Sequence, residues 1–239
     1  MNVPERCVHI LNKAEDLAVF LLCLCLFFVG TYGLYDSFLI VHQANDDSIL
    51  KYKPGSEDDI PEQKISGNMT AWLTLEGTEI DDPVMQGEDN FEYLNKNPYG
   101  EYSLAGSIYL DSRNSPDYSD EYSLLYGHHM ENSAMFGDLD LYRQEKFFRE
   151  YTEGTLTVGD EVRKITVIAV LNVSATDPVI FSPENRTKEE ILDKIRRDHM
   201  YYRQAEGEQL IAFSTCRYPD TTERTVVVGV LEQSYELQQ

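Results

Sequence analysis

The chain has 239 residues, of which 42 are acidic and 20 are basic, and its formal net charge is −22. A surface this acidic repels the phosphate backbone, so nucleic acid is excluded as an expected partner. We find no glycine-rich phosphate loop and no Cys or His spacing of the zinc type, and we therefore expect neither a cofactor nor a bound metal.

The first predicted element is an apolar helix over 17–35, a stretch without a charged residue. It would span roughly 28 Å, close to the hydrocarbon thickness of a bilayer. We interpret it as a single-pass transmembrane anchor, with 1–16 on the cytoplasmic side and the rest outside the cell. The alternative is a cleaved signal peptide, but the run is long for one and no small-x-small cleavage site follows. Lysines and arginines give this orientation only weak support.

The next segment, 36–69, is polar and is interrupted by Lys53-Pro54-Gly55 and Ile60-Pro61. Prolines and glycines at this density break regular structure. The segment is predicted to be a stalk with helical pieces, one of them around 37–52, that leads to a second domain over 70–239.

Short apolar runs bounded by turn residues recur after residue 70 and predict a mainly β domain whose sheet closes or curls. The eight predicted strands are 71–75, 84–86, 107–110, 124–126, 155–158, 162–173, 209–214 and 225–231.

Two helical segments interrupt these strands. The segment 139–151 is amphipathic, with aromatic residues among charges. A longer helix is predicted from Lys188, because Thr187 and Glu190 form a capping box. Its apolar stripe begins at Ile191 and continues as far as Tyr202, directly before the strand that precedes Cys216.

Cys216 is the only cysteine that follows the apolar N-terminal stretch. An isolated cysteine at a strand is ordinarily a small buried core residue. Here, however, Arg224 opens the following strand, and an upstream turn contains His128 and His129. A thiol, an imidazole and a guanidinium at strand edges indicate nucleophilic catalysis.

Five pieces of sequence, in this order and spacing, resemble the class B sortases over about 70–231. Each piece alone is unspecific, but the ordered set is specific. The pieces are Asp82-Pro83-Val84-Met85-Gln86-Gly87 with Asp89-Asn90, Gly106-Ser107-Ile108-Tyr109-Leu110-Asp111 with Arg113-Asn114, Tyr126-Gly127-His128-His129-Met130 with Met135-Phe136-Gly137-Asp138-Leu139, Ser214-Thr215-Cys216, and Arg224-Thr225-Val226-Val227-Val228.

The resemblance implies a closed eight-stranded β-barrel with peripheral helices, including one long helix before the cysteine strand. It implies that Cys216 attacks a Thr-Xaa peptide bond of a sorting signal and forms a thioester. His128 would protonate the departing amine, and Arg224 would hold the substrate or stabilise the oxyanion. An amine acceptor then remakes a peptide bond.

His128 is preferred to His129 because it takes the family's position after Tyr126-Gly127, and because neighbours in a strand point apart. His129 is then a loop or rim residue. His199 is interpreted as a surface or packing residue, and His9 and His42 fall outside the domain.

Four neighbours of the site stay open. Ser214 and Thr215 either place a donor in the groove or are ordinary strand residues. Arg217 stands where some class B relatives carry an acidic residue, so it either lowers the thiol pKa or faces solvent. Glu223 is either a partner of an arginine or a surface carboxylate.

The expected function is therefore a membrane-anchored transpeptidase on the outer cell face. Its partners would be surface proteins or pilins with sorting signals, and the acceptor amine a peptidoglycan precursor or a pilin lysine. One alternative is a cysteine peptidase, although in papain-like enzymes the cysteine precedes the histidine. Another is a non-catalytic surface protein. The sorting motif is not readable, but the loop 173–187, with Thr176, Val179, Ile180 and Phe181, is expected to influence it.

Overall fold

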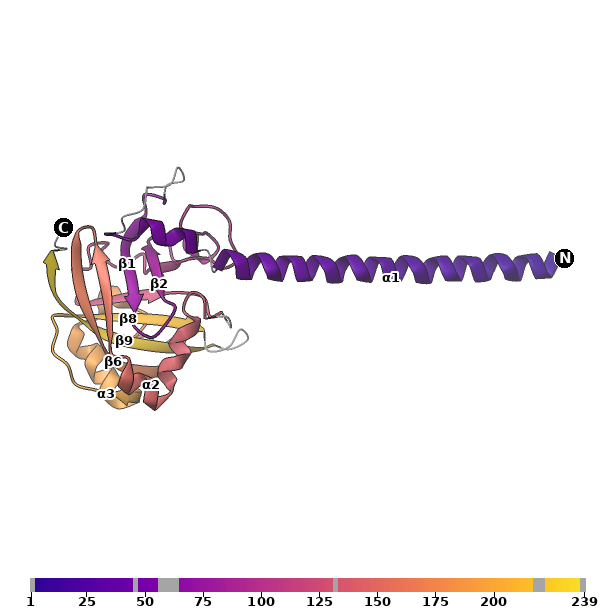
Figure 1. Cartoon of the computed structure of the whole chain (residues 1–239). Coiled ribbons are helices and arrows are strands. Elements are labelled where there is room, and N and C mark those ends of the chain that lie inside the picture. The colour runs from indigo at the N-terminus through magenta and orange to yellow at the C-terminus, as the bar shows by residue number, and fades with distance from the viewer. Residues whose placement is uncertain (1–2, 45–46, 56–64, 131–132, 217–221, 237–239) are drawn as a thin grey trace. The chain divides into compact units, whose positions relative to one another are not determined.

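The computed structural model describes residues 3–44, 47–55, 65–130, 133–216 and 222–236 (Figure 1). The chain divides into two compact units, Met1–His42 and Gln43–Gln239. Helix α1, Val3–Ala44, forms the first unit and contains a stretch, Asn12–Leu39, that is long and apolar enough to cross a membrane. The predicted anchor 17–35 lies inside this stretch. The helix continues beyond it to Ala44, and the short helix η1, Asp47–Tyr52, follows, so helical structure occupies the part of the stalk around 37–52 where we expected a helical piece.

The second unit is built on one sheet (Figure 1). The described residues contribute nine strands to it. Eight strands pair in the order β5-β1-β2-β3-β4-β8-β9-β6, and pairing of β5 with β6 closes the ring. Strand β7 adds to β6 outside the ring. The predicted closed eight-stranded barrel is confirmed. The strands are β1 Met69–Leu75, β2 Asp81–Met85, β3 Ile108–Leu110, β4 Tyr122–Tyr126, β5 Glu153–Val158, β6 Glu161–Ser174, β7 His199–Tyr202, β8 Gln209–Cys216 and β9 Glu223–Glu236.

Two layers of apolar side chains hold the barrel together. One fills its interior and includes Ile211 and Phe213 of β8. The other lies on the opposite face of the same strands, includes Leu210 and Ala212, and is covered by Ile191 of helix α3, Lys188–Asp198. Because β8 is buried on both faces, its sequence is a continuous apolar run rather than an alternating one.

Short helices occupy the connections. The segment 139–151, predicted as one amphipathic piece, is divided between the 3-10 helix η3 and helix α2. The short helices are η1 Asp47–Tyr52, η2 Glu92–Leu94, η3 Gly137–Arg143, α2 Glu145–Glu150 and η4 Pro183–Asn185.

Helix α3 begins with the predicted capping box between Thr187 and Glu190. It ends at Asp198, earlier than its apolar stripe suggested. Residues 199–202 instead form β7, in which Tyr202 pairs with Ala169 of β6. The free edge of β6 offers these residues main-chain partners that a longer helix would forgo, and a strand therefore separates the helix from β8.

The capping box predicts a measurable contribution to stability. Thr187→Ala removes the side chain that accepts from the Glu190 amide. We expect a loss of about 1 kcal/mol, which corresponds to a melting temperature lower by about 2–4 °C in a domain of this size. Thermal unfolding followed by circular dichroism measures it. Thr187→Ser keeps the hydroxyl and should melt like the wild type, and equal melting of all three proteins would show that the cap contributes nothing.

Candidate active site

Three neighbouring strands bring the predicted site residues to one edge of the barrel. Strand β4 runs parallel to β8, with Tyr126 opposite Ser214, and β8 runs antiparallel to β9, with Cys216 opposite Arg224. The Gly127 amide extends the β4–β8 pairing by donating to the Ser214 carbonyl at 3.2 Å. Strand β8, which ends at Cys216, therefore lies between two neighbouring strands. On one side the chain after β4 continues to His128, and on the other side β9 carries Arg224. For Cys216 the structure describes the backbone, and Arg217 lies outside the described residues.

His128 has a main-chain partner from a distant segment. Its Nε2 lies 2.8 Å from the carbonyl oxygen of Leu94, at the end of η2. A carbonyl only accepts, so Nε2 carries a proton and Nδ1 is the nitrogen left for chemistry. Gly106 allows this close approach, because a Cβ at that residue would lie 2.6 Å from the Leu94 oxygen and 3.1 Å from His128 Cδ2.

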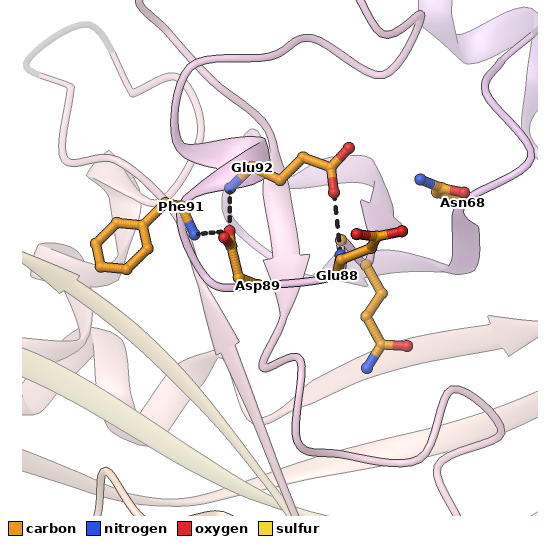
Figure 2. Close-up of a pocket in the computed structure, with 7 residues that line it drawn as sticks. Asn68, Glu88, Asp89, Phe91 and Glu92 are labelled. Atoms are coloured by element: carbon orange, nitrogen blue, oxygen red, sulfur yellow. Dashed lines mark hydrogen bonds between the residues drawn. The ribbon is translucent and has the colours of Figure 1, made fainter.

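Acidic residues hold the turn that presents Leu94. Asp89 Oδ1 accepts from the amides of Phe91 at 2.8 Å and Glu92 at 3.0 Å, and Glu92 Oε2 accepts from the Glu88 amide at 3.0 Å (Figure 2). These carboxylates are thus engaged in building the turn. The turn borders a pocket lined by Asn68, Gln86, Gly87, Glu88, Asp89, Phe91 and Glu92. Within the described ranges, no three His, Cys, Asp or Glu residues are arranged to hold a metal ion.

His129 has partners different from those of His128. Its Nε2 lies 3.0 Å from Asp140 Oδ2 on η3. Asp140 Oδ1 accepts from Thr225 Oγ1 at 3.0 Å, and Arg143 Nη1 donates to that hydroxyl at 3.3 Å. The second histidine, which we expected on a loop or rim, therefore links the histidine turn to the start of β9, beside Arg224.

A buried carboxylate lies behind the site. Asp111 is fully buried and accepts hydrogen bonds from Arg113 Nε at 2.8 Å, Arg113 Nη2 at 2.7 Å, Asn90 Nδ2 at 2.9 Å and Tyr126 OH at 2.9 Å. Burial alone would raise the pKa of Asp111, but the hydrogen bonds from Arg113 and Tyr126 outweigh it and lower the pKa below its ordinary value. Burial and the Asp111 charge raise the pKa of Tyr126. At neutral pH the carboxylate is therefore ionised and the phenol remains a donor.

The structure also describes the surroundings of Arg224 and of three residues near the site that the sequence left open. Arg224 Nη1 donates to the main-chain oxygen of Glu223 at 3.3 Å, and the Glu223 carboxylate accepts from Asn172 Nδ2 at 3.4 Å. Ser214 and Thr215 are buried, and their hydroxyls have no hydrogen-bond partner among the residues that the structure describes.

The other histidines lie elsewhere. His199 Nδ1 contacts the Ile195 carbonyl oxygen at 2.8 Å at the end of α3, and its ring packs against Tyr202. His9 and His42 belong to α1. His199 is exposed and contacts its neighbours at the end of α3, which agrees with its interpretation as a surface or packing residue.

Sequence reasoning assigned no role to three groups of the site. The Leu94 carbonyl is a main-chain atom and leaves no signal in residue type. Asp140 is one of several charges in the segment 139–151, and an amphipathic pattern does not single it out. Asp111 was visible, because it stands with Arg113 in one of the ordered motifs, but its position as a common acceptor depends on contacts between distant segments.

The chain matches the family model described as the sortase domain over residues 73–232. It is 31% identical over 159 residues to sortase B of Listeria monocytogenes, a match that covers 64% of this chain and 65% of that protein. Sortase B of Staphylococcus aureus is 27% identical over 174 residues, which cover 70% of this chain and 71% of that protein. The matched part therefore spans slightly less than two thirds of the Listeria protein.

Solved structures agree with these matches. A class B sortase of Streptococcus pyogenes, described as involved in pilus biogenesis, is 38% identical, with a TM-score of 0.65, and the match covers 70% of this chain and 94% of that one. Sortase B of Clostridium perfringens is 28% identical, with a TM-score of 0.64, over 70% of this chain and 96% of that one. The barrel is thus shared over nearly the whole length of these solved chains.

The contact between His128 and Leu94 can be tested with a pair of glycine variants. Gly106 and Gly100 both have positive φ, at +65° and +86°, but open space surrounds Gly100. Alanine at either residue should cost about 1–2 kcal/mol in backbone strain. Only Gly106→Ala should displace the Leu94 oxygen and change the nitrogen chemical shifts and tautomer of His128 in NMR spectra. An unchanged His128 spectrum in Gly106→Ala would contradict the described contact.

Proposed function

The chain belongs to the sortase family, and on that premise we propose that it is a membrane-anchored class B cysteine transpeptidase. Its donor substrate is a surface protein or pilin with a sorting signal, which it cleaves at a Thr-Xaa bond. The observation that carries the proposal is the register of β4, β8 and β9, in which Cys216 lies opposite Arg224 and the main chain of β4 leads alongside β8 to His128. This arrangement suits nucleophilic acyl transfer.

In the first half-reaction the Cys216 thiolate attacks the carbonyl carbon of the threonine. A carbon–sulfur bond forms, and the carbon–nitrogen bond of the peptide breaks. The departing amine takes a proton from His128, and Nδ1 supplies it because Nε2 contacts the Leu94 oxygen. A thiol with an ordinary pKa of about 8.5 is a few per cent ionised at neutral pH, and a neighbouring cation increases that fraction.

Arg224 supplies this positive charge but cannot act as a base, because its guanidinium does not lose a proton in proteins. Its role is to bind the substrate or the oxyanion with fixed donors. In the second half-reaction an amine attacks the thioester. A new carbon–nitrogen bond forms, the carbon–sulfur bond breaks, and the proton of the amine returns to His128.

The acceptor amine is proposed to be a lysine of a pilin subunit. The support is the streptococcal relative, which is 38% identical and is described as involved in pilus biogenesis. A peptidoglycan amine is the alternative acceptor. Helix α1 would hold the enzyme in the membrane, with the barrel on the outer face, where its substrates are exported.

The proposal predicts a covalent intermediate on one residue. The full-length protein in detergent is mixed with LPxTG-like and NPxTN-like peptides, and intact mass and peptide mapping locate any adduct. We expect an acyl adduct on Cys216 that an added amine removes, and no adduct in Cys216→Ala. His128→Gln should slow acylation by about 10²-fold or more, since general acid catalysis contributes that much.

The alternatives give different products in this experiment. A cysteine peptidase would release the free acid at the same rate and in the same yield with or without the amine. A non-catalytic surface protein would form no acyl adduct with any peptide, even if iodoacetamide alkylated Cys216. Either result would reject the transpeptidase.

The acceptor is predicted separately. With both amines present in equal concentration, a pilin-derived lysine peptide should be joined to the donor in preference to a peptidoglycan cross-bridge amine. Mass spectrometry distinguishes the two products. Exclusive use of the cross-bridge amine would assign the enzyme to wall anchoring instead.

A further inference from the structure

The loop 175–187, between β6 and α3, runs from one part of the candidate site to another. It leaves β6 after Ser174, and the preceding residue, Val173, pairs with Arg224 in β9. Farther along, Phe181 stacks on Tyr126 of β4 with ring centroids 6.4 Å apart and ring planes at 15°. His128 follows Tyr126 by two residues, so the loop reaches from the arginine strand to the histidine strand along the edge where Cys216 lies.

Several contacts hold this loop to the elements next to it. Asp177 forms an ion pair with Lys194 of α3 at 2.6 Å, and the Ile180 carbonyl accepts from Tyr122 OH at 3.1 Å. These contacts anchor the loop to α3 and to β4. Both contacts involve the first half of the loop, up to Ile180.

Arg113 holds the second half of the loop. Its Nη2 donates to the Phe181 carbonyl at 3.0 Å, and its Nη1 lies 3.1 Å from Glu184 Oε2. The same guanidinium is bound from the other side by Asp111, through Nε and Nη2. A planar guanidinium can make these bonds in several directions at once, which a lysine ammonium in the same place cannot reproduce.

Asp111 connects Arg113 to the histidine. Its Oδ2 accepts from Tyr126 OH, on the strand that leads to His128, and from Asn90 Nδ2. Asn90 belongs to the turn that presents the Leu94 carbonyl to His128. One buried carboxylate thus bonds to both segments that place His128 and, through Arg113, to the loop 175–187.

We propose that Asp111 and Arg113 are positioning residues that hold the loop 175–187 against β4 in one arrangement and so determine how tightly the donor peptide binds. The inference rests on the proposed function for the identity of the peptide, an extended segment with a sorting signal. The loop would form one side of its binding groove. Neither residue takes part in bond making.

The test uses Arg113→Lys in the full-length protein in detergent, because this change keeps the charge and removes the planar group. We expect KM for the donor peptide to rise about tenfold, the equivalent of about 1.4 kcal/mol, with kcat reduced much less. Amide hydrogen exchange in 177–185 should become faster. Alkylation of Cys216 by iodoacetamide, which needs no groove, should proceed at the wild-type rate.

Two further variants serve as a control and as an independent test of the contact between Arg113 and the loop. Arg149→Lys alters an exposed arginine whose ion pair with Glu145 lies within α2, and it should change none of the three measurements. Glu184→Gln removes the charged partner on the loop without touching the buried carboxylate. It should raise KM by a smaller factor than Arg113→Lys, and it remains informative if Arg113→Lys fails to fold.

The outcomes distinguish a failure of the positioning role from a failure of the proposed function. Wild-type KM and wild-type exchange in both Arg113→Lys and Glu184→Gln would overturn the positioning role, as would a fall in kcat and alkylation with KM unchanged. If the wild type formed no adduct with any peptide, the proposed function would fail. Hydrogen exchange in the loop would still decide whether Arg113 holds it, because that measurement requires no substrate.

Discussion

The parallel pairing of β4 with β8 is the constraint on which the site depends. Parallel neighbours end at the same side of a sheet, so the segment after Tyr126 and the end of β8 meet at one edge. Strand β9 then pairs antiparallel to β8 and begins where β8 ends. Residue 128 is far in the chain from residues 216 and 224, and this topology brings all three to one edge of the sheet.

Polar contacts fix the side chains at the edge to which the sheet brings the site residues. His128 meets a main-chain carbonyl, His129 meets Asp140, and Asp111 bonds to Arg113, Tyr126 and Asn90. The Asp111 carboxylate is removed from water, which is costly unless its lone pairs are satisfied, and the several donors around it meet that condition. A carboxylate held this firmly also fixes its donors, which come from strand β4 and from the connections that contain Asn90 and Arg113.

Strands could be predicted where their residues are buried, because burial makes their sequences rich in apolar residues. β6, β8 and β9 contain runs of apolar and β-branched residues. The predicted bounds match β6 and β8 to within two residues at each end, whereas β9 continues to Glu236, five residues beyond its predicted end at 231. Strand β7 was missed, because Met200 and Tyr202 continue the apolar stripe of α3, and only the free edge of β6 decides that they extend. The pairing order itself depends on distant segments, and so do the partners of His128 and Asp111. The resemblance to a family, rather than any local pattern, supplied the roles of Cys216, His128 and Arg224.

The order of the strands along the chain also bears on when the enzyme becomes active. Strands β8 and β9 follow all other described strands in sequence, yet β8 sits between β4 and β9 in the ring. Domains generally fold as units during synthesis, and contacts between distant segments form slowly. The barrel therefore cannot close until its final strands have emerged. A nascent chain without these strands would carry His128 and His129 but not the strand that holds Cys216, so the site would be incomplete until the last part of the barrel is made.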